Sequence, residues 1–407
     1  MEETTMKKWA KFLSLALAAT ISFTGCGSAG TTAGATTTGA TTAEASDNGN
    51  TEELVDFNIG HLPATGHILY FIAYEEGFFA EEGLNVTLTQ YSNNTEELAA
   101  LESGKLDVAP INATNLIKFI GEGHDITSFG GVMSDGHALV IDPDLVEGLS
   151  EEEYHNNLEI LKGKTIVLQA NSTYDIEFRT ALLEAGFDLE KDITILTADS
   201  GTDAFNSLKN KEIDGAAVYA PFRQIALNDG YIPLMYCDEI DYFDHPICCR
   251  EVTLTENINA DPDKYVAFTR AMIRASQFLL EDKDKSIDDA LKYLDIDREI
   301  LYEDTYNHSI NNPDPDESKT VTFYNAMLTL GYIDKEINVT ESVNNEIYET
   351  ALNDLISKDP DNAYLKELQE YHENALYTAD CCTKDGTTGE TADCCGDAEE
   401  KVAACCD

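Results

Sequence analysis

The fold is decided by two stretches that align without a gap, NTEELAALESGKLDVAPI at residues 94–111 and GTDAFNSLKNKEIDGAAV at residues 201–218. The second begins 107 residues after the first, and this offset places Asp107 on Asp214. Each stretch has a helical pattern that leads into a short apolar segment typical of a strand. A unit that occurs twice in the same order predicts two similar lobes.

The match continues upstream of both stretches. Residues 85–88 fall on residues 192–195 at the same offset, and the alternating strand 55–59 corresponds to residues 165–168 with one extra residue. Strands that alternate with helices are typical of a mostly parallel sheet covered by helices. Residues 261–375 have apolar residues at helical spacing. We therefore expect an α/β protein with two lobes, each a mostly parallel sheet flanked by helices, and a helical C-terminal part.

Residues 1–25 have the order of segments of an export signal. Three lysines between positions 7 and 11 precede an apolar run at residues 12–23, which is shorter than the roughly 20 residues of a membrane-spanning helix. The signal ends in Phe-Thr-Gly before Cys26, which resembles a bacterial lipobox; an ordinary secretory signal that ends near a cysteine is the alternative. Residues 27–50 are almost wholly Gly, Ala, Thr and Ser, as expected of a flexible tether. We therefore expect an extracytoplasmic protein anchored to the bacterial cell membrane by lipid on Cys26.

The charge of the chain argues against one class of partner. With 26 Lys and Arg against 76 Asp and Glu, the formal net charge is −50, whereas nucleic acid requires clustered basic residues. After the export signal no stretch reaches the about 18 apolar residues of a membrane span. The expected hinges lie near residues 140–162 and 236–250. The expected parts are lobe 1 at 51–145, lobe 2 at 146–240, a return to lobe 1 with C-terminal helices at 241–378, and a Cys-rich acidic tail at 379–407.

Three segments carry a family resemblance. They are GHLPATGHILYFIAYEEGFFAEEGLNVTL, ALESGKLDVAPINATNLIKFIGEG and DITSFGGVMSDGHALV, in this order between residues 60 and 140. Their Pro-containing loop and the patterns G-x-F-x-x-E-G-L and A-L-x-x-G-x-L-D resemble the NMT1/THI5-like solute-binding proteins for nitrate, sulfonates, taurine and pyrimidine precursors. With GKTIVLQANSTYDIEF and EIDGAAVYAP in the second lobe, the resemblance covers about residues 55–235.

The resemblance implies both a fold and a function. The fold is the type II periplasmic-binding-protein fold. The function is that of the solute-binding component of an ABC importer, with no catalytic activity. Its partners would be a small-molecule ligand, permease subunits and a cytoplasmic ATPase.

The loops that follow the predicted strands hold the candidate ligand residues. In open α/β sheets, ligands bind beyond the carboxyl ends of the strands, where loops meet helix starts. The hydroxyls, amides and backbone N–H groups there suit anionic or strongly polar small ligands. The candidates in the first lobe are Pro63, Thr65, Gly66, His67, Asn112, Thr114, Ser134 and Gly136. Those in the second lobe are Gln169, Ser172, Thr173, Tyr174 and Tyr219.

Basic residues are scarce in these loops. His67 is the only basic candidate of the first lobe, while Arg179 lies inside a predicted helix and Arg223 follows a proline. A sulfonate or nitrate site usually has an Arg or Lys, or else relies on helix starts. A neutral, zwitterionic or heterocyclic ligand is therefore as consistent with the sequence as an anion. A capping or surface role for His67 is an equal alternative to ligand binding.

Cysteines supply a second hypothesis. Besides Cys26 and Cys237, the chain has four adjacent pairs, which are Cys248 with Cys249, Cys381 with Cys382, Cys394 with Cys395, and Cys405 with Cys406. Adjacent cysteines form only a strained ring disulfide, so an internal disulfide framework is not expected. Thiolates bind thiophilic metal or metalloid ions, and the alternative function is binding or sensing of such an ion through these pairs. For the tail, inter-chain disulfides and the absence of a defined role stay open.

A pyrimidine synthase is the third hypothesis. The segment HPICCR, with His245 next to the cysteine pair, loosely resembles the cysteine-rich motif of pyrimidine-synthesising relatives. Such enzymes need a cofactor-bearing lysine near the first-lobe loops, but between residues 55 and 120 the only lysines are Lys105 and Lys118. The sequence also lacks GxSxG, P-loop and HExxH motifs. We therefore expect no enzyme and no cofactor, apart from the thiophilic ion of the second hypothesis.

Overall fold

The computed structural model describes residues 54–198 and 200–376. The expected export signal with Cys26 and the tether lie outside these residues. None of the described helices is both long and apolar enough to cross a bilayer.

The metal ligands expected in the tail also lie outside the described residues. They are Cys381, Cys382, Cys394, Cys395, Cys405 and Cys406. Their expected binding of a thiophilic ion therefore stays a prediction from the sequence. Of the four adjacent cysteine pairs, only Cys248 with Cys249 falls within the described part of the chain.

The chain alternates strands and helices as far as residue 254 and is mainly helical afterwards. The strands are β1 Val55–His61, β2 Leu84–Gln90, β3 Ala109–Asn112, β4 Ile126–Asp135, β5 His137–Ile141, β6 Thr165–Gln169, β7 Thr194–Ala198, β8 Gly215–Tyr219, β9 Ile232–Tyr236, β10 Ile247–Leu254 and β11 Ser309–Ile310. The helices up to β10 are η1 Thr65–His67, α1 Ile68–Glu75, α2 Phe78–Glu81, α3 Asn94–Glu102, α4 Ala113–Glu122, η2 Pro143–Val146, α5 Glu151–Tyr154, η3 Leu158–Leu161, α6 Thr173–Glu184, α7 Gly201–Lys209, α8 Phe222–Asn228 and η4 Cys237–Glu239. The later helices are α9 Thr255–Ala260, α10 Pro262–Glu281, α11 Lys283–Ala290, α12 Arg298–Tyr306, α13 Glu317–Thr329, η5 Val339–Ser342, α14 Asn345–Lys358 and α15 Ala363–Ala375.

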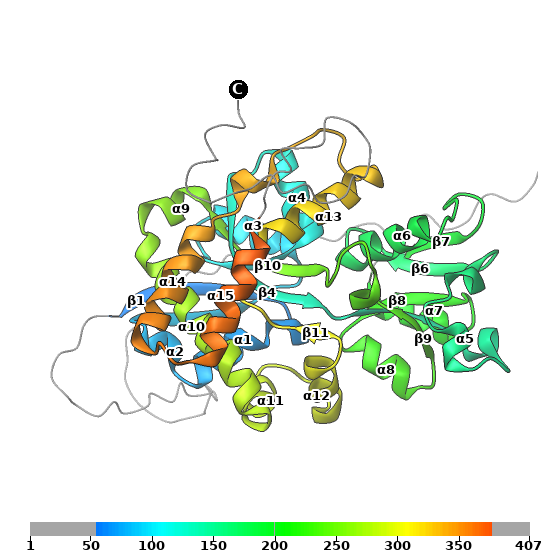
Figure 1. Ribbon diagram of the computed structural model, residues 1–407, viewed down its shortest axis with the longest axis horizontal. Coiled ribbons are helices and arrows are strands. Elements are labelled where there is room, and N and C mark those ends of the chain that lie inside the picture. The colour runs from blue at the N-terminus through cyan, green and yellow to red at the C-terminus, as the bar shows by residue number, and fades with distance from the viewer. Residues whose placement is uncertain (1–53, 199, 377–407) are drawn as a thin grey trace, which may run out of the picture. The chain divides into compact units, whose positions relative to one another are not determined.

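Three sheets divide between two lobes (Figure 1). The first lobe contains the parallel pair β1-β2 and the sheet β11-β4-β10-β3, and the second contains the sheet β7-β6-β8-β5-β9. Strand β10 runs antiparallel to β3 and β4, and β5 runs antiparallel to β8 and β9. Each lobe therefore adds antiparallel strands to a parallel unit, so the sheets are mixed where mostly parallel ones were expected.

The parallel units of the two lobes have the same register, 107 residues apart. Asn58 lies opposite Thr87 in β1-β2, and Thr165 lies opposite Thr194 in β6-β7. Helices α3 and α7 also begin and end at matching positions. The extra residue expected between the first strands is not present. Because β1 pairs with β2 and β6 pairs with β7, Asn58 in the first lobe corresponds to Thr165 in the second. A comparison of the two sequences alone does not contain this pairing.

One aspartate in each lobe closes this unit. The Oδ2 atom of Asp107 accepts the backbone N–H of Asn58 at 2.8 Å, and the backbone N–H of Asp107 donates to the Asn58 carbonyl at 2.8 Å. Asp214 and Thr165 exchange the same two bonds, each 2.8 Å long. The two bonds hold the turn before β3 or β8 against the first strand of its lobe, so both aspartates are structural.

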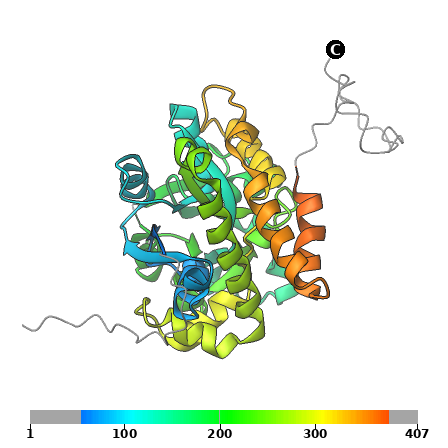
Figure 2. The ribbon, with the colours of Figure 1, turned by 90° about the vertical axis from the view of Figure 1, so that its left-hand side faces the viewer.

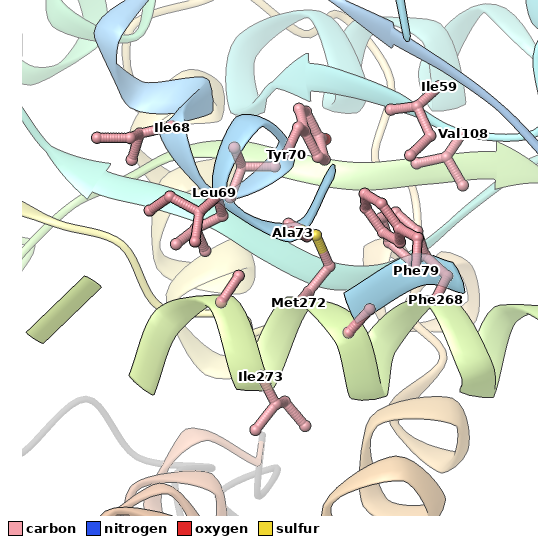
Figure 3. Packing of buried hydrophobic residues seen from close by; sticks show 14 of the residues in the cluster. Ile59, Ile68, Leu69, Tyr70, Ala73, Phe79, Val108, Phe268, Met272 and Ile273 are labelled. Carbon is pink, nitrogen blue, oxygen red and sulfur yellow. The ribbon is translucent and has the colours of Figure 1, made fainter. Parts of the chain in front are cut away.

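The core of the first lobe lies between β1, α1 and α10. Tyr70, Ala73 and Phe79 converge on Phe268 and Met272 of α10 (Figure 3), and the rings of Phe79 and Phe268 stack at 5.9 Å. Helix α14 packs against α10 and α15 packs against α14 (Figure 2). The C-terminal helices thus complete the first lobe, except that α13 contacts α4 and α6 and contributes to the core of the second lobe.

The chain crosses between the lobes twice. β4 ends at Asp135 and β5 begins at His137, so the first crossing lies at Gly136, whose φ of 94° is in the left-handed region. The second crossing occupies residues 237–246, between β9 and β10. The expected first boundary at residue 145 lies farther along the chain, inside η2. Because β4 and β5 are buried at every residue, the sequence contains no change of pattern that marks the crossing.

Replacement of the two aspartates tests this account of the duplicated unit. Loss of a hydrogen-bonded acceptor costs about 1–3 kcal/mol when it is buried, and less for these two carboxylates, which are half-buried. We expect Asp107→Ala to lower the free energy of unfolding by more than Asp214→Ala, because Asp107 also accepts Lys264 Nζ at 2.8 Å, whereas Lys164 Nζ lies 3.8 Å from Asp214. Denaturant unfolding of both variants measures the difference. Unchanged unfolding midpoints would contradict the structural role.

Candidate ligand site at the junction of the lobes

Two helices start on either side of the junction between the lobes. The side chain of Asn112 accepts the backbone N–H of Asn115 at 2.8 Å and caps α4, and Ser172 caps α6 by accepting the N–H of Asp175 at 3.1 Å. Thr114 Oγ1 donates to the Ser172 carbonyl at 3.1 Å and links the two helix starts. First-turn N–H groups lack partners within the helix and carry partial positive charge. The junction therefore has donors that suit polar or anionic groups.

The loop after β1 is packed against its own lobe. His67 is 1% exposed and its Nδ1 atom accepts the backbone N–H of Leu62 at 3.0 Å. Burial, together with a neighbouring histidine, lowers the pKa of His67 to about 3, so this ring is neutral and supplies no cation. Thr65 and Gly66 are also buried, whereas Pro63 is exposed.

Ser134 and Gly136 lie at the first crossing and bind protein groups. Ser134 Oγ accepts Arg250 Nη2 at 3.2 Å, and the backbone N–H of Gly136 donates to the carbonyl of His308 at 2.8 Å. These two candidate ligand residues therefore hold the backbone of the first crossing through contacts with other protein groups.

The second lobe contributes a group of aromatic and polar side chains. Tyr174 stacks on Tyr219 with ring centroids 5.9 Å apart and donates its hydroxyl to Gln169 Oε1 at 2.5 Å. Thr173 Oγ1 lies 3.5 Å from His137 Nε2. Burial raises the pKa of Tyr174, which keeps the phenol neutral. The structure thus brings together the four expected residues Gln169, Thr173, Tyr174 and Tyr219.

Beside Thr173 and Tyr174 lie three buried residues that the sequence did not indicate as candidates for the site. His137 Nδ1 lies 2.8 Å from Glu177 Oε2, and the backbone N–H of His137 donates to Cys237 Sγ at 3.3 Å. Burial raises the pKa of Glu177 to about 7 and that of Cys237 to about 12. Burial alone would lower the pKa of His137, but the Glu177 carboxylate raises it above its ordinary value. His137 and Glu177 do occur in the family-like segments, and this is the one signal that could have identified them.

The cysteine pair of β10 is buried, and His245 lies apart from it. Irregular pairing of β10 with β4 around Cys249 accompanies a distance of 3.5 Å between the sulfur atoms of Cys248 and Cys249. The Nδ1 atom of His245 instead pairs with Asp135 Oδ2 at 2.9 Å. The grouping of His245 with the two cysteines, on which the synthase-like motif rests, is therefore not seen.

The guanidinium groups near the junction are bound to protein atoms. Arg223 donates to the carbonyls of His308 and Asn307 at 2.9 and 2.7 Å. Arg250 donates to the Met133 carbonyl at 2.7 Å, and Arg179 donates to an aspartate of its own helix at 2.6 Å. These arginines have a structural role and are not presented to a ligand.

A cavity of about 420 Å³ lies on another part of the second lobe. Its lining includes Ala181 and Glu184 near the end of α6, and Tyr242 after η4. The end of α6 is opposite to the helix start at the junction. The cavity therefore does not belong to the candidate site.

Two mixed α/β lobes joined by two crossings, with a candidate site at their junction, define the periplasmic-binding-protein class. The crystal structure of the periplasmic nitrate-binding protein NrtA of Synechocystis PCC 6803 has this fold, with a TM-score of 0.64 and 14% identity over 80% of this chain and 99% of that one. The model of the NMT1-like family matches residues 50–294, and the chain belongs to this family. The expected two-lobe fold and family are thereby confirmed.

Two relatives differ in the function that their names give. A protein of Brucella abortus named as a binding protein is 24% identical over 243 residues, which is 58% of this chain and 70% of that protein. The 4-amino-5-hydroxymethyl-2-methylpyrimidine phosphate synthase of Schizosaccharomyces pombe is 25% identical over 299 residues, which is 67% of this chain and 81% of the synthase.

A glycine substitution tests the packing of the first-lobe loop. A Cβ atom on Gly66 would lie 1.8 Å from Met133 Sδ, so Gly66→Ala should displace Met133 and cost about 1–3 kcal/mol. Gly121→Ala is the control, because its Cβ would meet only Ile337 at 3.9 Å within a helix where alanine is favoured. Thermal unfolding measures both variants. If Gly66→Ala combined with Met133→Ala costs as much as the sum of the single changes, the predicted clash is wrong.

Two buried carboxyl groups lie in the first lobe near this loop. Glu97 accepts Asn94 Nδ2 at 2.7 Å, and Glu251 accepts the Tyr70 hydroxyl at 2.6 Å. Burial raises the pKa of each carboxyl to about 8. Both are therefore protonated in neutral solution, and the lobe carries less negative charge here than the sequence suggests.

The raised pKa of Glu97 predicts a pH dependence of stability. The folded state holds the proton up to about pH 8, whereas the unfolded chain loses it near the ordinary value of 4.5. The contribution is therefore complete below that value and is lost as the pH rises to 8, with a slope of up to about 1.4 kcal/mol per pH unit. Denaturant unfolding between pH 4.5 and 8 should show a smaller slope for Glu97→Gln. The exposed Glu212→Gln is the control, and equal slopes for wild type and Glu97→Gln would contradict the prediction.

Proposed function

We propose that the chain is the extracytoplasmic solute-binding component of an ABC importer and that it captures a small polar or anionic molecule between its lobes. The observation that carries the proposal is the pair of capped helix starts at Asn112 and Ser172, linked across the junction by Thr114. A ligand held by both starts would favour one arrangement of the lobes. The permease of the importer would then recognise that arrangement.

The ligand classes are those that the family resemblance implies, namely nitrate, sulfonates and pyrimidine-like molecules. Helix starts and hydroxyl groups support an anion or a polar group, while the stacked Tyr174 and Tyr219 support a flat heterocycle. Because the arginines near the junction bind protein groups, recognition of an anion would depend on neutral donors.

Membrane anchoring by lipid on Cys26 and the assembly with permease subunits and an ATPase belong to the same proposal. A binding protein held at the membrane by a tether stays close to its permease, which raises its effective concentration there. The export signal and the lipobox-like sequence supply the support for the anchor.

A binding function is favoured over a pyrimidine synthase. Lys118 Nζ donates to Asn171 Oδ1 at 2.8 Å and so links the two lobes, and Lys105 is exposed after α3. Neither lysine is part of the loop after β1, where the synthase hypothesis requires one.

A thermal-shift screen of nitrate, alkanesulfonates, taurine, pyrimidines and amino acids tests the proposal. A ligand at about 100 times its Kd adds about 2.7 kcal/mol of stability, so one class should raise the Tm without being converted to product. Tyr219→Ala should weaken this response, since it removes the stacked partner of Tyr174.

Tyr242→Ala is the matched control, because Tyr242 lines the separate cavity of the second lobe. Loss of the response in Tyr242→Ala but not in Tyr219→Ala would move the site to that cavity. Turnover of the ligand would contradict the proposed class of function.

A further inference from the structure

His137, Glu177 and Cys237 bring a nitrogen, an oxygen and a sulfur donor together in the protein interior. His137 is the first residue of β5, Glu177 lies in the second turn of α6 and Cys237 is the first residue of η4. Their ligand atoms lie within 4.8 Å of one another, and no other such group of three occurs within the described ranges. The three residues are 3%, 0% and 0% exposed.

A second feature of the cluster is an unsatisfied carboxylate oxygen. Glu177 Oε2 faces His137 Nδ1 at 2.8 Å, but Glu177 Oε1 has no hydrogen-bond partner among the described residues. A buried polar atom without a partner is costly. The carboxylate of the cluster therefore has one oxygen free to bind a further group.

The opposite side of the imidazole has its own partners. His137 Nε2 lies 3.5 Å from Thr173 Oγ1 and 3.8 Å from Cys248 Sγ. If Nε2 carries the proton and donates it to these acceptors, the lone pair of Nδ1 points into the cluster. Histidines that bind metals are commonly oriented by such a hydrogen bond from the other ring nitrogen.

We propose that this cluster is a binding site for one thiophilic divalent cation of the Zn²⁺ type, held by His137 Nδ1, Cys237 Sγ and one carboxylate oxygen of Glu177. One thiolate and one carboxylate cancel the charge of the ion, so that the buried site is neutral. Ligands 2.0–2.3 Å from a tetrahedral ion lie about 3.6 Å apart. Binding of the ion therefore requires the 2.8 Å pair of His137 Nδ1 and Glu177 Oε2 to open, and any pair near the 4.8 Å limit to close.

The position of the site gives it a consequence for the two lobes. His137 directly follows the first crossing at Gly136, and Cys237 begins the second crossing. An ion bound to both residues would fix the second-lobe ends of the two crossings to each other and to α6. This role is independent of the solute and does not require the proposed transport function.

Cobalt binding tests the site. The protein is the full-length chain in which Cys26 and the six tail cysteines are replaced by serine, so that only the three buried thiols remain. Titration with Co²⁺ should show one equivalent bound per chain, with thiolate-to-cobalt charge-transfer absorption, and Zn²⁺ should displace it. Cys237→Ser should abolish this absorption, and Glu177→Gln should weaken Co²⁺ binding at least tenfold.

The matched control is His155→Ala. His155 Nε2 also lies 2.8 Å from a carboxylate oxygen, that of Glu239, but within residues 54–198 and 200–376 no thiol joins them in a cluster. Its Co²⁺ binding should equal that of the parent protein. Far-UV circular dichroism of each metal-free variant shows whether it is folded, and if Cys237→Ser is unfolded, His137→Gln replaces it.

Two results would overturn the proposal. One is the absence of charge-transfer absorption in the folded parent protein. The other is absorption that survives Cys237→Ser, which with loss in Cys248→Ser would place the sulfur ligand on β10. Neither result depends on whether a transported solute is found.

Discussion

The reciprocal hydrogen bonds of Asp107 and Asp214 set the positions on which both lobes depend. Each aspartate fixes the start of a third strand beside the first, and that strand ends in a junction residue, Asn112 in β3 and Tyr219 in β8. The turn before each aspartate is duplicated as well. Gly104 and Lys211 occupy the same place with φ of 69° and 56°. Lysine is unfavourable at positive φ. Because Lys211 nevertheless adopts the same backbone conformation as Gly104, the two copies of the repeat share the geometry of this turn even where the residue differs.

The two lobes differ in what is added to this shared unit. In the first lobe β10 inserts antiparallel between β3 and β4 and buries Arg250 and Glu251, and in the second β5 takes the corresponding inner place. The Arg250 guanidinium donates to the carbonyl of Met133, and burial keeps Glu251, which accepts the Tyr70 hydroxyl, protonated. The junction consequently presents neutral donors, although the chain as a whole is strongly acidic. A ligand would be selected there by geometry and hydrogen bonding more than by net charge.

The sequence predicted the repeat because both copies keep the same helix, turn and aspartate. It also predicted the helix starts, since Thr114, Ser172 and Thr173 follow strand-like segments at the expected places. It did not predict His137 or Glu177. His137 lies within a run that is buried on both faces and shows no alternation, and Glu177 reaches it across 40 residues of chain. Such a contact depends on the crossing at Gly136, which no local pattern marks.

Left-handed backbone conformations collect at both crossings, which constrains any motion of the lobes. Asp135 and Gly136 have φ of 63° and 94° at the first crossing, and Asp244 and His245 have φ of 48° and 69° at the second. Non-glycine residues adopt such angles where their surroundings hold them. The holding contact here is the 2.9 Å pair between Asp135 Oδ2 and His245 Nδ1, which joins one crossing to the other. Any change in the angle between the lobes would therefore have to turn both crossings together or break this pair.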